Sequence, residues 1–240
     1  MDYVDKNMLA RALNRIRSHQ HIFISIVQIL LITIILTPLS FASPDYPREW
    51  WQAFPKDPTK PWEILPQEAE YGKYVILSKR TELGIFSNFS ATPFTLDEKK
   101  YASVEGFWQM MKYPDPQDKE DPRYRKDLVW KYTRSEVAQL TGFEAKEAGD
   151  ATKENYQKLG ITWISYQGKR MEYKGKDKQE HYELIFRAIK AKIDQNEKVK
   201  DLLKATGTLI LRPDHIQEPD VPPAYRYYDI LMKIRSDLTP

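Results

Sequence analysis

Residues 103–112 carry an apolar stripe and a polar row at helical spacing, and this pair of patterns constrains the fold more than any other stretch. The stripe consists of Val104, Phe107, Trp108 and Met111. The polar row consists of Glu105, Gln109 and Lys112, at positions i, i+4 and i+7. The segment is therefore predicted to be a short helix that packs one face against a core and carries the polar row along its flank.

Ser103 is a plausible N-cap for this helix. A capping box would place a glutamate where Gly106 stands, so capping does not explain Glu105. Two interpretations of the polar row stay open. Such rows are commonly solvated faces whose charges contribute a few tenths of a kcal/mol. The alternative is a row of groups that bind or react with a ligand.

The loop before the helix favours the second interpretation. It reads Gly-Ile-Phe-Ser-Asn-Phe over residues 84–89, and Pro93-Phe94 and Tyr101 follow before the helix begins. Loops supported by rigid elements commonly carry binding groups. Ser87 and Asn88 offer a hydroxyl and an amide that can hydrogen-bond a ligand, although Ser-Asn is also a common turn pair.

These residues resemble the opening signature of the NADAR (YbiA-like) family. The matching elements are Gly84-Ile85-Phe86-Ser87-Asn88-Phe89, Pro93-Phe94, Tyr101, Ser103-x-Glu105 and Gln109-x-x-Lys112. Later blocks also resemble the family: residues 144–149, 188–196, Leu202-Leu203 with Thr206-Gly207, and 230–235. The resemblance covers residues 71–238. Where many members have a tryptophan-glycine pair and a glycine-rich segment, residues 212–223 here are rich in proline and acidic side chains.

The resemblance implies an enzyme, a hydrolase that cleaves the N-glycosidic bond of an ADP-ribosyl or ribosyl-phosphate substrate. Substrates of this type are ADP-ribosylated guanine and intermediates of the riboflavin pathway. The catalytic residues would be Glu105, Lys112 and Asp214, and Asp220 competes with Asp214 for the acid near the last strand. The residues expected to bind substrate are Ser87, Asn88, Phe89, Ser103, Trp108, Gln109 and Arg170. The alternative is a binding module for ADP-ribose or a nucleotide without turnover.

The chemistry agrees with a carboxylate at position 105. Cleavage of a ribosyl N-glycosidic bond develops positive charge at the anomeric carbon, which a carboxylate stabilises while it activates water. Lys112 can contact phosphate or favour the ionised form of Glu105. No cofactor or metal is expected: the chain has no cysteine, and two of its four histidines, His19 and His21, precede the predicted domain.

The first residues indicate export. Three arginines precede an apolar run over residues 22–36, and Ser40-Phe41-Ala42 matches a cleavage site of a secretory signal peptide. The alternative is a membrane anchor over residues 22–42. Cleavage after Ala42 would take the formal charge from +3 to +1, so net charge gives no support for nonspecific binding to nucleic acid. The expected ligand is a nucleotide-like small molecule or an ADP-ribosylated base, and no protein partner is predicted.

The predicted organisation is a signal peptide or anchor over residues 1–42, a proline-rich arm over 43–70 and one NADAR-like domain over 71–240. The fold class is α+β, a compact helix-rich domain with a few short strands. Strands are predicted at 74–77, 94–96, 100–101 and 208–211, and a hairpin in the insertion 161–178 around Gly168-Lys169. Helices are predicted at 123–133, 135–140, 143–159 with a break near Gly149, from 180 to about 195, and at 227–238.

Overall fold

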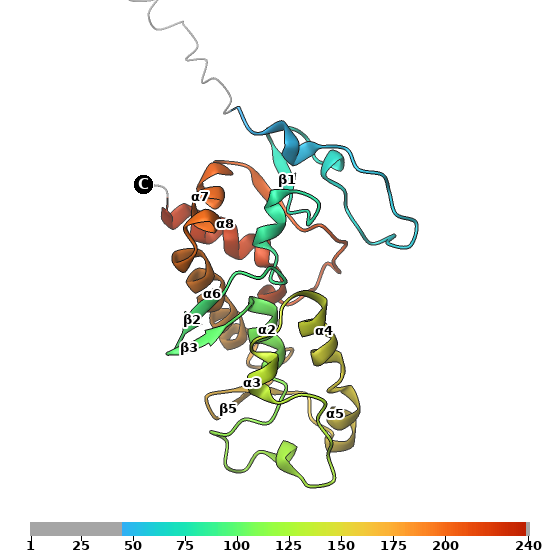
Figure 1. Cartoon of the computed structure of the whole chain (residues 1–240), viewed down its shortest axis with the longest axis vertical. Helices are drawn as coiled ribbons and strands as arrows, with labels where there is room; N and C mark the ends of the chain where they lie inside the picture. The colour runs from blue at the N-terminus through green and yellow to red at the C-terminus, as the bar shows by residue number, and fades with distance from the viewer. Residues whose placement is uncertain (1–44, 239–240) are drawn as a thin grey trace, which may run out of the picture. The chain divides into compact units, whose positions relative to one another are not determined.

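The structure is a computed structural model that describes residues 45–238, which belong to one compact unit, Pro44–Pro240 (Figure 1). Its helices are α2 (Val104–Met110), α3 (Arg134–Val137), α4 (Gly142–Asp150), α5 (Lys153–Leu159), α6 (Lys178–Gln195), α7 (Glu197–Ala205) and α8 (Tyr227–Leu238). Its strands are β1 (Tyr74–Ile76), β2 (Phe94–Leu96), β3 (Lys99–Tyr101), β4 (Ile164–Tyr166), β5 (Lys169–Met171) and β6 (Ile210–Arg212). The prediction of a helix-rich α+β domain is confirmed for these residues.

The described strands form three separate pairs. Strands β2 and β3 make an antiparallel hairpin, as do β4 and β5, whereas β1 and β6 pair in parallel although they are far apart in the sequence. Asp97 and Glu98 both have positive φ (48° and 64°), as the two central residues of a type I′ hairpin turn require. The second hairpin turns at Gln167-Gly168, one residue earlier than the sequence predicts.

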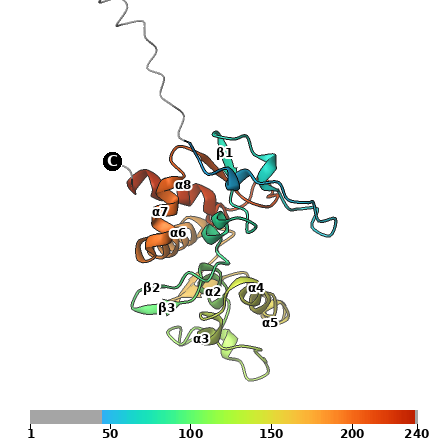
Figure 2. The same ribbon diagram turned by 45° about the horizontal axis from the view of Figure 1, so that its top comes forward.

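Helix α2 lies at the centre of the described unit and contacts α3, α4 and α6. In both views α6, α7 and α8 group on one side of it, and α3, α4 and α5 lie on the other (Figure 2). Ser103 is confirmed as its N-cap, because the Ser103 Oγ accepts a hydrogen bond of 2.9 Å from the Gly106 amide. Gly106 permits the close approach of the next segment: a Cβ there would lie 2.5 Å from the Leu140 carbonyl oxygen.

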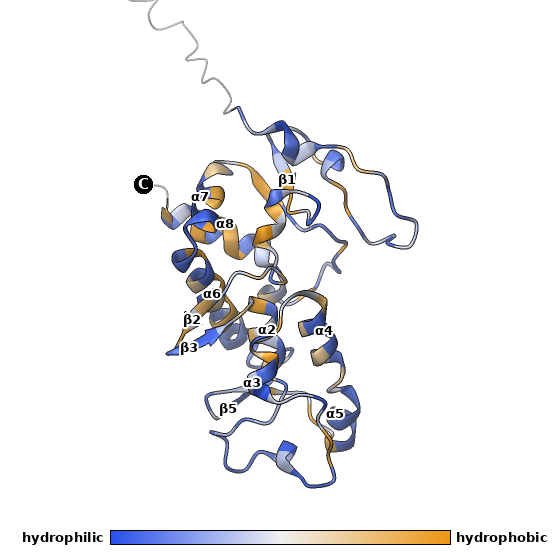
Figure 3. Cartoon of the chain, in the orientation of Figure 1, coloured by the Kyte–Doolittle hydropathy of each residue, from blue (hydrophilic) through white to orange (hydrophobic). Residues whose placement is uncertain are grey.

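The apolar stripe of α2 packs into the main core. Val104, Phe107 and Met111 are at most 1% exposed, and they meet the apolar face of α6, which includes Ile185 and Ile189. Helix α5 is mainly hydrophilic, whereas apolar residues gather where α7 and α8 meet (Figure 3). The core therefore joins the helices that follow residue 177 to the hairpins and to α2.

Part of the proline-rich arm belongs to this core. Tyr46 and Trp50 are 4% and 1% exposed, and the indole N–H of Trp50 donates a 2.6 Å hydrogen bond to Glu82. Trp62 in the same arm is 45% exposed. The predicted signal peptide or anchor lies outside the described residues. No helix between residues 45 and 238 combines the length and the apolar character needed to cross a membrane.

One predicted helix is wrong. Residues 123–133 contain only the end of a 3-10 turn, η4 (Pro122–Tyr124), and continue as an irregular segment. The reason is that two side chains take carbonyls that a helix would use, one from within the segment and one from α5. The indole of Trp130 donates to the Arg123 carbonyl at 3.0 Å, and the amide of Asn155 donates to the Val129 carbonyl at 2.9 Å. The predicted break near Gly149 is confirmed, because α4 ends at Asp150, and the last predicted helix coincides with α8.

Candidate functional site

A cavity of about 260 Å³ opens beside α2. Its walls come from the loop that follows η3 (Glu82–Phe86), from α2, α4 and α6, and from η5 (Pro223–Tyr225). The lining residues used below are Asn88, Phe89, Glu105, Trp108, Gln109, Lys146, Asp150, His181 and Tyr225. Five of the predicted site residues therefore meet in one place: Asn88, Phe89, Glu105, Trp108 and Gln109.

The loop that carries Asn88 and Phe89 is fixed to two helix N-termini. The Glu105 amide donates to the Asn88 carbonyl at 2.9 Å, and the Gly142 amide donates to the Phe89 carbonyl at 2.8 Å. These bonds use amides at the starts of α2 and α4 that have no partner within their own helices. The loop is thereby held against the helix that carries Glu105.

Lys192 holds the same loop from α6. Its ammonium donates to the Ile85 carbonyl at 2.7 Å, to the Ser87 carbonyl at 2.8 Å and to the Ser90 hydroxyl at 2.9 Å. The side chain is 1% exposed, and burial lowers its pKa to about 7. Lys192 stands on the apolar face of α6 between Ile189 and Ile193. A charged residue inside an apolar stripe can indicate a buried charge, but no role was predicted for Lys192.

Glu105 and Gln109 are buried, so the interpretation of their row as a solvated face is wrong. They are 7% and 5% exposed, and the Gln109 amide donates a 2.6 Å hydrogen bond to the Glu105 carboxylate. Burial raises the pKa of Glu105 above its ordinary value, while the hydrogen bond from Gln109 and the charge of Lys112 oppose that rise. A carboxyl group with a raised pKa can serve as an acid or a base nearer neutral pH.

Lys112 follows the end of α2 and is half-buried beside the cavity. Its ammonium lies 5.4 Å from the centre of the Trp108 ring. Burial lowers the pKa of Lys112 to about 8, against the opposing influence of Glu105 and Asp150. Lys112 is not in the lining of the cavity, but its charge still favours the ionised form of Glu105.

Aromatic rings make the opposite wall. The His181 ring lies 4.6 Å from Trp108 and 6.1 Å from Tyr225, measured between ring centres. His181 is 1% exposed and burial lowers its pKa to about 4, so its imidazole is neutral at physiological pH. The sequence analysis missed His181 and Tyr225, because neither belongs to a motif that marks it as a ligand group.

Several buried polar atoms around this cavity have no hydrogen-bond partner within residues 45–238. They are the Asn88 Oδ1, the Gln109 Oε1 and both ring nitrogens of His181. An unsatisfied buried polar atom costs about 1–3 kcal/mol, so native proteins contain few of them. Their gathering beside a buried carboxylate is the pattern expected of a site that completes its hydrogen bonds with a ligand.

Besides Lys112, four predicted site residues lie outside the cavity lining. The Ser103 hydroxyl caps α2 and donates to the Leu140 carbonyl at 2.8 Å. The Ser87 side chain accepts from the Phe89 amide inside its own loop. Arg170 lies on the β4–β5 hairpin, where its guanidinium bonds to Asp118 at 2.6 Å. Asp214, the fourth, lines a neighbouring cavity.

That second cavity has a volume of about 490 Å³ and lies between the N-terminal arm and the segment after β6. Asp214 bonds there to Lys79 at 2.6 Å and to His215 at 3.0 Å. Burial acts to raise the pKa of Asp214, but the hydrogen bonds from His215 and Lys79 hold it below its ordinary value. The two cavities are neighbours, because Phe89 of the first packs edge to face on Phe143 of the second at 5.3 Å. Asp220 lines neither cavity.

One solved structure resembles this chain. It is the NMR structure of the E. coli protein YbiA, with 19% sequence identity and a TM-score of 0.43, and the match covers 69% of this chain and 84% of that one. No family model matches the sequence, and no curated protein matches it. Membership of the NADAR family therefore stays a prediction.

The geometry assigns distinct tasks to the residues of the first cavity. Glu105 supplies a carboxylate in a dry environment, and Gln109 orients it. Asn88 and His181 offer polar atoms to a ligand, and Trp108 and Tyr225 offer ring surfaces. The described residues contain no group of three or more acidic or histidine side chains arranged to hold a metal ion. This arrangement has room and hydrogen-bonding groups for a planar or sugar-like ligand beside a buried carboxylate.

Proposed function

We propose that the chain is an N-glycosidase that hydrolyses the bond between a ribosyl carbon and a base in an ADP-ribosyl or ribosyl-phosphate substrate. The observation that carries this proposal is the buried Glu105, bonded to Gln109, in a cavity whose lining also holds buried polar atoms without a partner among residues 45–238. The resemblance of residues 84–112 to the NADAR signature supports the same substrate class. The cavity is slightly smaller than the range of about 300–1,000 Å³ usual for drug-sized ligands. The cavity can hold the ring of the sugar whose bond is cleaved, while the rest of the substrate lies outside.

In this mechanism the bond from the anomeric carbon to the base nitrogen breaks while a bond to a water oxygen forms. The ionised Glu105 stabilises the developing positive charge and accepts the proton of the attacking water. The electron pair of the broken bond leaves with the base, which takes a proton from solvent water, and Glu105 returns the proton that it accepted to solvent. Lys112 keeps part of the Glu105 population ionised, and Gln109 holds the carboxylate in place.

The test is release of free base or ADP-ribose from a panel of substrates. The panel contains ADP-ribosylated guanine in nucleic acid and ribosyl-phosphates of the early riboflavin pathway, each incubated with the full chain and with its Glu105→Gln variant. Turnover that is lost in the variant supports the glycosidase and identifies the substrate class. Turnover that the variant retains would remove Glu105 from the mechanism.

A binding module without turnover is the second candidate. It is favoured by the position of Asp214, which lies in the neighbouring cavity rather than beside Glu105, and by the departure of residues 212–223 from the family pattern. Saturable binding of ADP-ribose with no product from any member of the panel would support the module over the enzyme.

We also propose that the protein is exported through residues 1–42. The motivation is the order of charged residues, apolar run and small residues in that segment. N-terminal sequencing of the protein recovered from cells decides the point. A chain that begins at Ser43 supports a cleaved signal peptide, and a chain that begins at Met1 in the membrane fraction supports the anchor.

Gly149→Ala is expected to lower turnover about tenfold or more while the protein stays folded. A Cβ at Gly149 would lie 1.6 Å from the Gln109 Oε1, so the amide must move and release Glu105. A hydrogen bond to a charged group contributes about 1.5–3 kcal/mol. Because that bond lowers the pKa of Glu105, its loss should also shift the acidic limb of the pH–rate profile to higher pH.

Gly175→Ala is the matched control for this substitution. A Cβ at Gly175 would meet its nearest atom, in the Glu172 side chain, at 3.4 Å, which is ordinary contact. Its rate and pH profile should equal those of the unmodified chain. If Gly149→Ala also leaves the profile unchanged, the contact between Gln109 and Glu105 has no part in the reaction.

A further inference from the structure

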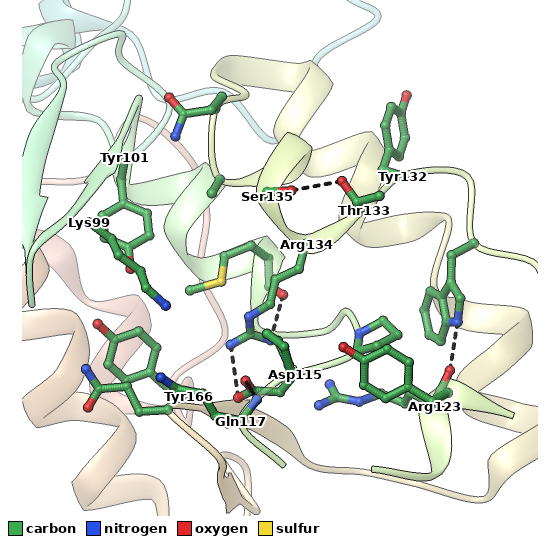
Figure 4. A pocket seen from close by; sticks show the side chains of 18 of the residues that line it. Lys99, Tyr101, Asp115, Gln117, Arg123, Tyr132, Thr133, Arg134, Ser135 and Tyr166 are labelled. Carbon is green, nitrogen blue, oxygen red and sulfur yellow. Dashed lines mark hydrogen bonds and ion pairs between the residues drawn. The ribbon is translucent and has the colours of Figure 1, made fainter. Parts of the chain in front are cut away.

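A third and larger cavity, of about 870 Å³, lies on another side of α2 (Figure 4). It is distinct from the cavity that contains Glu105: Met110 lines this one, whereas the preceding residue, Gln109, lines the other. Its walls come from the β2–β3 hairpin, the segment 114–133 with α3, and the β4–β5 hairpin. The proposed glycosidase chemistry makes no use of it.

Aromatic rings form much of its wall. They are Tyr101, Tyr124, Trp130, Tyr132 and Tyr166. Tyr124 is 55% exposed, although it belongs to a turn that is anchored by the buried Arg123. Figure 4 shows the rings of Tyr101 and Tyr166 facing the same space as the Lys99 side chain. A planar ligand can stack on aromatic ring faces that border a cavity, whichever base or substituent it carries.

The charges at this cavity are mainly positive and only partly compensated. The one lining carboxylate, Asp115, lies 3.4 Å from Arg134, and Arg125 pairs with Asp127. Lys99, Lys100 and Lys126 also line the cavity and have no ion pair with any of residues 45–238. Ammonium groups without a carboxylate partner favour an anionic ligand, and phosphate oxygens are common acceptors for them.

Arg134 gives the cavity a rigid floor. Its guanidinium donates to the Met110 carbonyl at 3.1 Å, to the Tyr113 carbonyl at 2.9 Å and to the Ser165 carbonyl at 2.7 Å. These bonds join the end of α2 to strand β4, so the walls do not depend on a ligand for their position. A volume of about 870 Å³ lies within the usual range for small-molecule sites.

We propose that this cavity is a second ligand site, which binds a nucleoside monophosphate or a similar anion with a planar ring. The ring packs against the aromatic wall at Tyr124, and the phosphate meets the ammonium groups of Lys99 and Lys100. The site is independent of Glu105, so it can exist whether or not the chain is a glycosidase.

The test is calorimetric titration of the full chain with adenosine monophosphate, adenosine and inorganic phosphate. Adenosine monophosphate should bind saturably, and each of the two fragments should bind at least tenfold more weakly, because each makes only half of the contacts. Tyr124→Ala and the double variant Lys99→Gln/Lys100→Gln should each weaken the binding of the monophosphate at least tenfold. All three side chains are exposed, so these variants should fold.

Two controls locate the ligand. Lys198→Gln/Lys204→Gln removes the same charge from exposed positions on α7 and should leave the affinity unchanged. Asn88→Ala alters the Glu105 cavity and should also leave it unchanged. The proposal is overturned by an absence of saturable binding, by Tyr124 and lysine variants that bind as the unmodified chain does, or by binding that Asn88→Ala abolishes.

Discussion

Glu105→Gln is expected to lower turnover by about 10³-fold, the middle of the range for loss of a general acid or base. The amide has the size of the carboxyl group and can still accept the hydrogen bond from Gln109, so the geometry of the site is preserved. In the proposed mechanism, what is lost is the negative charge that would stabilise the sugar cation and the group that would take a proton from water. Affinity for the substrate should change far less than the rate constant.

The same variant is expected to raise the unfolding temperature at neutral pH. Because burial raises the pKa of Glu105 above the ordinary value of 4.5, the folded state binds this proton more tightly than the unfolded state does. Stability that depends on this proton is present below pH 4.5 and is lost as the pH rises through the pKa of the folded state. Glutamine remains neutral, so its advantage should grow from about pH 4.5 upward.

Thermal unfolding of both chains from pH 4 to pH 9 measures this difference. The Glu136→Gln variant is the control, since Glu136 is an exposed carboxylate whose pKa is lowered by hydrogen bonds from Thr133, so its loss should slightly lower stability at neutral pH. A Glu105→Gln chain that is less stable than the unmodified one at pH 7 would show that the carboxylate is not strained by burial.

Arg123→Met is expected to lower the free energy of unfolding by about 3–5 kcal/mol, because it leaves a buried carboxylate without its partner. Arg123 and Asp121 are both fully buried, and the guanidinium bonds to Asp121 at 2.8 Å and to the Met111 carbonyl at 2.9 Å. It also bonds to the Ser165 hydroxyl. One side chain thus ties segment 114–135 to the end of α2 and to β4.

Urea unfolding of the full chain measures this loss. Arg125→Met is the matched control, because Arg125 pairs with Asp127 at 2.6 Å but both side chains are at least half exposed. An exposed pair contributes about 0–1 kcal/mol, so the control should stay within that range. Adding Asp121→Asn to Arg123→Met should recover part of the loss. Equal effects of the two arginine substitutions would contradict the proposed role of burial.

The sequence pattern predicts an element correctly where the spacing of residues within that element determines its structure. The stripe and cap of residues 103–112 predict α2, and the apolar spacing after residue 180 predicts α6, because both signals lie within a few turns of one helix. The type I′ turn at Asp97-Glu98 is likewise a local property. Segment 123–133 was mispredicted because its carbonyls bond to Trp130 and to Asn155, and a residue's helical preference carries no information about such partners.

Some residues of the candidate site could likewise be predicted from local sequence, and others could not. Asn88, Phe89, Glu105 and Gln109 come from neighbouring stretches of sequence, and one loop and one helix bring them together. His181 and Tyr225 enter from α6 and η5, so only the packing of distant elements places them at the cavity. Asp214 follows a strand, β6, as predicted. Because β6 pairs with β1, the Asp214 carboxylate contacts Lys79 and does not lie beside Glu105.

The parallel pairing of β1 with β6 also constrains when the chain can fold. Tyr74 pairs with Ile210 and Ile76 with Arg212. Strand β1 therefore cannot pair until the ribosome has made β6, more than a hundred residues later. Until then Val75 and Leu77, both fully buried in the finished protein, lack the strand that pairs beside them. During synthesis the first part of the domain therefore exposes an unpaired strand edge, which favours aggregation until β6 is made.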